Sequence, residues 1–295
     1  MAFNLSTFRT RALTAIVFAI VMLGGLLWNQ WSFLLLFCII HFGCWWEYFN
    51  LLEKIYNTRL NPYLRQGFMM TGFSLLLFFC AASYQVAGYA LKWNLAIPVS
   101  AAGFVMLVIG IFQKEPIHLK AMLASGLGWL YISLSWALMI KLYHHPVTIN
   151  LGDSQYVFNG MFLPVVIVAG IWINDTMAYV VGSFMGKTPL SPVSPKKTWE
   201  GTIGGILLSV AVVGILASLF VHQSILWPLA GFIALLAFIA SVTGTLGDLL
   251  ESKLKRMAGV KDSGHFMPGH GGFLDRFDSL LLATTTVALF LLLCF

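Results

Sequence analysis

Apolar runs dominate this sequence, and each is about 20 residues long, the length that a helix needs to cross the hydrocarbon core of a bilayer. Hydrophobic residues make up 59% of the 295 residues, and charged residues only 9%. A soluble domain of this size could not hide so much apolar surface inside one core. The chain is therefore expected to be a multi-pass integral membrane protein.

Counting runs of this length predicts about nine transmembrane spans. The spans should be helices, because the hydrocarbon offers no partners for free backbone groups and the runs are too uniformly apolar for barrel strands. We therefore expect an all-α polytopic bundle with spans near residues 12–28, 32–50, 67–90, 94–112, 121–140, 161–183, 201–221, 227–247 and 279–295. The first run could also be a signal peptide, but a second run follows at once without a clean cleavage site, which favours a retained span.

The basic residues indicate how the chain is oriented. With nine spans, one side of the membrane carries all of the 17 Lys and Arg except Lys92 and Lys141. Positive residues accumulate in cytosolic loops. The N-terminus and the charged loops are therefore expected on the cytosolic side, and in a bacterium the membrane would be the inner one.

The two halves of the chain differ in polarity. Residues 1–150 have short loops and almost no intramembrane charge apart from Glu47, and Lys54 in the loop that follows reads as solvated or in contact with lipid headgroups. Residues 151–295 contain two polar loops, 184–200 and 248–278. The chemistry is therefore expected in the second half, in a catalytic transmembrane region.

Residues 247–279 form the densest polar stretch, with five of the 11 carboxylates, five of the 17 Lys and Arg, and two of the seven His. Such a polar island beside a membrane is costly unless it serves a function. Four polar residues are spaced zero, three, four and seven positions from Asp248, so they share one face if the preceding span continues as a helix. They are Asp248, Glu251, Ser252 and Lys255. Asp275 and Asp278, three apart, likewise share a face at the start of the last span.

Between these two groups, glycines and a proline forbid a long helix and allow a tight return of the chain. The return can bring Asp248 and Asp275 together as a carboxylate pair. Hard anionic oxygens beside phosphate-binding cations suit a magnesium site, completed by water and substrate phosphate. Zinc on His265 and His270 is the weaker alternative, because their spacing in a glycine-rich loop is not typical of zinc sites. A positioning or acid–base role for His270 is favoured.

Asp175 lies inside the predicted span 161–183, about 12 Å from its cytosolic end at 1.5 Å per residue. An ionisable residue at that depth predicts a functional site, and a structural hydrogen bond between helices is the alternative. Ala178, Gly182 and Gly186 follow at four-residue spacing, which lets another helix approach closely and wall a cavity around the carboxylate. The same face could instead form a subunit contact in a homodimer.

The loop 184–200 combines positive charge with a stiff backbone. Three prolines restrict it, and Lys187, Lys196 and Lys197 precede the next span. Lysines held on a stiff segment beside a helix N-terminus are suited to cradling a phosphate. Membrane orientation alone also predicts positive charge in a cytosolic loop, but orientation does not need a stiff backbone.

Residues 252–279 carry a family resemblance. The stretch is similar, nearly position for position, to the signature of the phosphatidate cytidylyltransferases, and it reads SKLKRMAGVKDSGHFMPGHGGFLDRFDS. Two earlier blocks also resemble that family, NDTMAYVVGSFMGKTPLSPVSPKKTWEG and GDLLES. The resemblance covers about residues 170–280, whereas the N-terminal half has no motif that we can match.

The resemblance implies transfer of the cytidylyl group of CTP to phosphatidic acid, giving CDP-diacylglycerol and pyrophosphate, with Mg²⁺ as cofactor. CTP, phosphatidic acid and membrane lipids are then the expected partners, and nucleic acid is not. Asp248 and Asp275 would bind the metal. The other candidate catalytic residues are Lys255, Arg256, Lys261, Arg276 and His270. The candidate substrate-binding residues are Asp175, Lys196, Lys197 and Asp278.

Two other functions are weighed against this one. A CTP-dependent lipid kinase would share the nucleotide and metal sites but needs a base for an alcohol substrate, for which His270 or Asp278 could serve. A transporter could use Asp175 as an ion carrier. Transporters often contain inverted repeats with matching broken helices, but here the polar features lie after residue 170 without an earlier counterpart.

Overall fold

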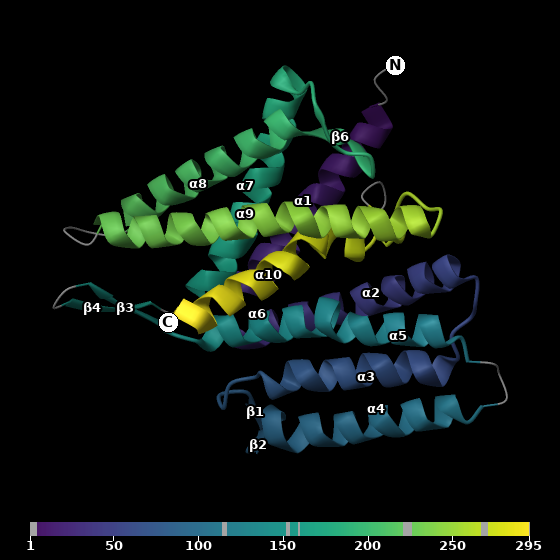
Figure 1. The fold of residues 1–295 in the computed structure, drawn as a ribbon. Helices are drawn as coiled ribbons and strands as arrows, with labels where there is room; N and C mark the ends of the chain where they lie inside the picture. The colour runs from purple at the N-terminus through teal and green to yellow at the C-terminus, as the bar shows by residue number, and fades with distance from the viewer. Residues whose placement is uncertain are drawn as a thin grey trace. The chain divides into compact units, whose positions relative to one another are not determined.

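A computed structural model describes residues 5–113, 117–151, 154–158, 160–220, 226–266 and 271–294, and Figure 1 shows its ribbon. The helices are α1 (Leu5–Leu27), α2 (Gln30–Tyr56), α3 (Pro62–Phe78), α4 (Ala96–Ile111), α5 (Leu119–Gly128), α6 (Leu134–His144), α7 (Phe162–Met185), α8 (Trp199–Phe220), α9 (Leu226–Met257) and α10 (Leu274–Cys294). Short π-helical turns, Leu91–Leu95 and Trp129–Ser133, precede α4 and join α5 to α6.

The strands in the described part of the chain form three antiparallel two-stranded hairpins. They are β1 (Gln85–Val86) with β2 (Tyr89–Ala90), β3 (Val147–Leu151) with β4 (Ser154–Phe158), and β5 (Pro189–Ser191) with β6 (Ser194–Thr198). Each hairpin joins two helical segments. The expected all-α architecture is confirmed.

Seven helical segments within the described residues are long and apolar enough to cross a membrane, by length and composition. They run over Gln30–Tyr56, Leu91–Ile111, Leu119–His144, Phe162–Met185, Trp199–Leu219, Leu229–Met257 and Leu274–Cys294. Helix α3, with 17 residues, and the apolar part of α1, Leu13–Leu27, are shorter. A polytopic membrane protein is thus confirmed, while the number of nine spans and the cytosolic N-terminus stay predictions.

The predicted span 67–90 was wrong at its C-terminal end. Helix α3 ends at Phe78 instead of reaching residue 90, because the chain turns into the β1–β2 hairpin, where Ala87 and Gly88 have φ angles of 50° and 82°. At the other end of the chain, α9 continues to Met257 and α10 begins at Leu274. Hydropathy marks the apolar part of a helix, but a helix also continues through polar residues that have partners.

The chain divides into two compact units, and the first comprises the described parts of residues 1–141 and 254–277. Its core is built on α2, where the Trp45 indole is fully buried and donates to Ser133 Oγ at 2.9 Å. Helices α3 and α4 lie side by side in Figure 1. A Cβ at Gly103 would lie 2.8 Å from the backbone nitrogen of Thr71, so glycine permits this close contact.

The second unit comprises the described parts of residues 142–253 and 278–295. Hydroxyl groups join its helices: Ser209 Oγ of α8 donates to the Gly170 carbonyl of α7 at 2.8 Å, and Ser241 Oγ of α9 donates to Ser209 Oγ at 3.2 Å. Such side chains hold helices together where lipid supplies no hydrophobic driving force.

Small residues bring α7 and α8 into backbone contact within this unit. A Cβ at Gly201 would lie 2.8 Å from the Ala178 carbonyl, and one at Gly205 would lie 2.7 Å from the Ala178 Cβ. The expectation that the face with Ala178 and Gly182 admits another helix closely is confirmed, and that helix is α8.

Gly205→Leu is expected to force α7 and α8 apart and to cost about 1–3 kcal/mol of stability, as overpacking typically does. Gly231→Leu on α9 is the matched control, because a Cβ there would meet nothing within 4 Å. Thermal unfolding in detergent micelles measures both variants. Equal losses of thermal midpoint in the two would contradict the close α7–α8 contact.

Candidate active site

The connection between α9 and α10, residues 258–273, turns sharply at both ends. After α9, Gly259 has a φ of 67°, and the amide of Val260 donates to the Lys255 carbonyl at 2.9 Å. This is the usual way in which glycine stops a helix. Before α10, Gly271 has a φ of 83°, and a Cβ there would lie 2.6 Å from Oδ2 of Asp275. The predicted tight return of the chain is confirmed, and residues 267–270, with His270, lie outside the described residues.

Asp275, in the first turn of α10, is the centre of this return. Its Oδ1 accepts a bond from Lys255 Nζ at 2.7 Å, and its Oδ2 accepts from the amides of Ser263 at 2.9 Å and Gly272 at 2.8 Å. The exposed fractions of the Asp275 and Lys255 side chains are only 8% and 13%. Three separate parts of residues 252–279 thus converge on one buried carboxylate.

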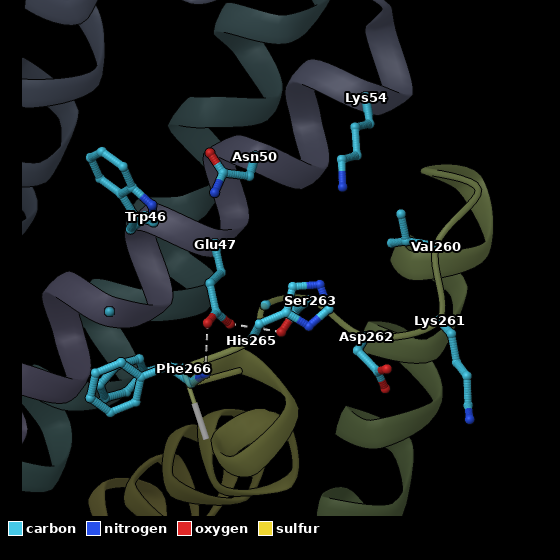
Figure 2. Close-up of a pocket in the computed structure, with 13 residues that line it drawn as sticks. Trp46, Glu47, Asn50, Lys54, Val260, Lys261, Asp262, Ser263, His265 and Phe266 are labelled. Atoms are coloured by element: carbon cyan, nitrogen blue, oxygen red, sulfur yellow. Dashed lines mark hydrogen bonds between the residues drawn. The ribbon is translucent and has the colours of Figure 1, made fainter. Parts of the chain in front are cut away.

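Glu47, from the middle of α2, forms a second carboxylate centre beside the first. Its Oε1 accepts from the amide of Phe273 at 2.9 Å, and its Oε2 accepts from the amide of Leu274 at 2.8 Å and from Ser263 Oγ at 2.7 Å. Figure 2 shows the bond between Glu47 and Ser263 as a dashed line. A carboxylate at this place satisfies amides that the start of α10 cannot pair internally, and it suits the positive end of the helix dipole.

Glu47 received no role from the sequence. The signal that could have found it is its position as a carboxylate in an otherwise apolar span. Glu47 is only 5% exposed, and a Cβ at Gly264 or Gly272 would collide with its carboxylate. The two glycines therefore leave the room that Glu47 needs.

A pocket of about 690 Å³ opens between α2 and the α9–α10 connection, as Figure 2 shows. This volume is typical of small-molecule sites. It is lined by Gly43, Trp46, Glu47, Asn50 and Lys54 of α2 and by Val260, Lys261, Asp262, Ser263, Gly264, His265, Phe266 and Phe273. Lys261, a predicted phosphate contact, is therefore a lining residue of a cavity large enough for a small molecule.

Asp248 belongs to the second unit, where it pairs with Lys197 of β6. Ser252 Oγ also donates to Asp248 Oδ1 at 3.2 Å, which confirms that these two residues share one face of α9. Lys197 lies in a hairpin whose base is held by Glu200, which accepts bonds from the amides of Lys187 and Thr188 at 3.1 and 3.2 Å. A predicted metal ligand and a predicted phosphate-binding lysine are thus in contact.

The remaining candidates differ in their burial. Asp175 is exposed on α7, with Asn174 Nδ2 at 3.5 Å from its Oδ1, and Asp278 is buried, with its Oδ1 accepting from the amide of Ser279 at 2.6 Å. The exposed basic residues are Lys196, Arg256 and Arg276. Arg256 Nη1 donates to the Val260 carbonyl at 3.2 Å and so braces the end of α9.

Asp248 and Asp275 each carry hard carboxylate oxygens, the donor type that magnesium prefers. In the described part of the chain, no three or more His, Cys, Asp and Glu side chains gather as a metal site. Magnesium, however, commonly uses only one or two carboxylates and completes its shell with water and phosphate. The two aspartates belong to different units, so their pairing stays a prediction.

The sequence matches the cytidylyltransferase family over residues 9–294. The chain belongs to that family. The match includes the first half of the chain, which has no recognisable motif. This half supplies Glu47 and one wall of the pocket.

Curated relatives of this cytidylyltransferase-family chain are named phosphatidate cytidylyltransferase. The protein of Synechocystis sp. is 42% identical over 134 residues, which are 45% of this chain and 44% of the relative. The chloroplastic phosphatidate cytidylyltransferase 4 of Arabidopsis thaliana is 32% identical over 201 residues, 64% of this chain and 50% of the relative. The Staphylococcus saprophyticus protein is 50% identical over 113 residues, 38% of this chain and 42% of the relative. The chain thus spans half or less of the length of these relatives.

Proposed function

We propose that this protein transfers the cytidylyl group of CTP to phosphatidic acid, giving CDP-diacylglycerol and pyrophosphate. The observation that carries the proposal is the convergence of Lys255, Ser263 and Gly272 on the buried Asp275, within the segment that resembles the phosphatidate cytidylyltransferase signature. Family membership and the names of the relatives support the same reaction.

The reaction is a direct displacement at phosphorus. An oxygen of the lipid phosphate, which is ionised near neutral pH, attacks the α-phosphorus of CTP without a strong general base. A P–O bond forms between lipid phosphate and CMP, while the bond between the α- and β-phosphates breaks and its electron pair leaves with pyrophosphate. The protein then contributes positioning and charge, and Lys255 and Lys261 reduce the repulsion between two anionic substrates.

Magnesium is the proposed cofactor, with Asp248 and Asp275 as its ligands, and when bound it offsets negative charge on the nucleotide phosphates. The protein contacts suggest which oxygen of Asp275 is used. Its Oδ2 accepts bonds from the Ser263 and Gly272 amides, whereas its Oδ1 accepts a bond from Lys255. Oδ1 of Asp275 would hold the cation, and Lys255 would then contact a substrate phosphate.

The site is proposed to face the cytosol, which holds CTP, at the level of the lipid headgroups. The asymmetric distribution of Lys and Arg supports this orientation. A homodimer also stays a proposal. Its contact would need a surface other than the Ala178 and Gly182 face, because that face packs against α8.

The proposed reaction is tested with purified protein in detergent micelles, magnesium, phosphatidic acid, and CTP labelled separately on its α- and γ-phosphates. Label from the α position is expected in the lipid, and chelation of magnesium is expected to stop the transfer. Label from the γ position would instead establish a lipid kinase. Transfer of neither label, with substrate flux in vesicles that lack CTP, would favour a transporter.

A further inference from the structure

One face of α2 runs along the whole pocket. Gly43, Glu47, Asn50 and Lys54 recur at intervals of four, three and four residues, so they lie on one side of the helix over about 16 Å. The opposite wall is the segment 260–266. Figure 2 shows Asn50 and Lys54 on α2 across from this segment.

The lining of the pocket presents more positive than negative charge to a ligand. The Glu47 carboxylate is already engaged by the amides at the start of α10 and by Ser263. Lys54 and Lys261 then outweigh Asp262. Within the described part of the chain, the Lys54 ammonium has no hydrogen-bond or ion-pair partner, although it is the last basic residue of α2 and lines a cavity.

Aromatic rings also line the pocket. The Phe266 and Phe273 rings lie with centroids 4.3 Å apart, and Phe266 is 64% exposed. An exposed ring beside cationic groups suits a ligand that has both a flat base and phosphates, because a base stacks on an aromatic face. A lipid phosphate alone would need only the cations, and about 690 Å³ is more room than one phosphate group requires.

We propose that this pocket binds the nucleoside triphosphate and that Lys54 contacts its phosphates. The inference rests on the proposed function, and it adds residues from the motif-free half of the chain to the nucleotide site. Ser263 places the pocket next to the proposed metal ligand Asp275. It lines the cavity, and its amide donates to Asp275 Oδ2 at 2.9 Å. In this arrangement the α-phosphorus, which is attacked, lies near Ser263, and the β- and γ-phosphates lie toward Lys54.

The test measures equilibrium binding of labelled CTP to the purified full-length protein without phosphatidic acid. Lys54→Met is expected to weaken CTP binding about tenfold, because a lysine–phosphate contact is lost. The KM for CTP should rise by a similar factor with little change in kcat, as expected for a contact made equally in the ground and transition states. Lys54→Arg keeps the charge and should retain most of the affinity.

Arg59→Met is the matched control, since Arg59 is an exposed cation five residues away that does not line the pocket. Its CTP affinity should equal that of the unmodified protein. Lys54 is also exposed, so all three variants should keep the same thermal midpoint.

Two results would overturn the assignment of the pocket alone. One is unchanged CTP binding in Lys54→Met, and the other is a raised KM for phosphatidic acid with an unchanged KM for CTP, which would make the pocket a lipid-headgroup site. Both results leave cytidylyl transfer intact. If the unmodified protein neither binds CTP nor transfers its α-phosphate, the proposed function fails together with the pocket.

Discussion

Asp275→Asn is expected to lower the rate of cytidylyl transfer by about 10²-fold or more and to destabilise the fold by about 3–5 kcal/mol, the usual cost of breaking a buried ion pair. Asn has one acceptor oxygen where Asp275 uses two. Its amide group must therefore face either the Lys255 ammonium or the amides of Ser263 and Gly272, all of which are donors. Loss of a charge that organises the phosphates typically lowers kcat by about 10²-fold or more.

A double-mutant cycle measures how much of the loss of stability comes from the ion pair between Lys255 and Asp275. Lys255→Met leaves Asp275 without its cation, and the double variant Lys255→Met, Asp275→Asn removes both charges. The double variant should lose clearly less stability than the sum of the single variants, because neither charge is left buried without a partner. Chemical denaturation in micelles measures the cycle, and strict additivity would show that the 2.7 Å contact between Nζ and Oδ1 contributes little.

The regular part of the fold follows from local sequence. The span predicted over 161–183 is helix Phe162–Met185, because an uninterrupted apolar run admits few alternatives in a membrane. The return of 258–273 was likewise predictable from its glycines. The helix ends at Met257 and Leu274 were not, because the polar residues there stay helical through tertiary contacts with side chains such as Lys255 and Asp275.

The contact between Glu47 and the start of α10 could not be predicted from local pattern. Glu47 and Leu274 are 227 positions apart, and periodicity describes only neighbours within one element. A single buried carboxylate says that a partner exists, but it does not say which one. The same holds for Lys54, which reads as a solvated or headgroup-facing lysine until the structure places it beside 260–266.

Glu47→Gln is expected to destabilise the protein by about 2–3 kcal/mol and to lower kcat by about tenfold or more. The carboxylate accepts three bonds, whereas Gln presents an amide group that is itself a donor toward Leu274 or Phe273. A buried amide left unpaired costs about 1–3 kcal/mol, and the charge opposite the helix N-terminus contributes further. The loss should extend to catalysis, because Ser263 donates its hydroxyl to Glu47 and its amide to Asp275.

Glu53→Gln is the matched control, six residues away on the same helix. Glu53 accepts from the Leu60 amide at 2.9 Å and pairs with Arg65 at 3.4 Å, in a partly exposed position where such a change costs about 1 kcal/mol or less. Thermal unfolding and initial rates at saturating CTP compare the two variants. Since Glu47 acts through the position of Asp275, its variant should lose kcat and should need more magnesium for half-maximal activity. Equal behaviour of the two variants would mean that Glu47 only fills space, and that the start of α10 is fixed without it.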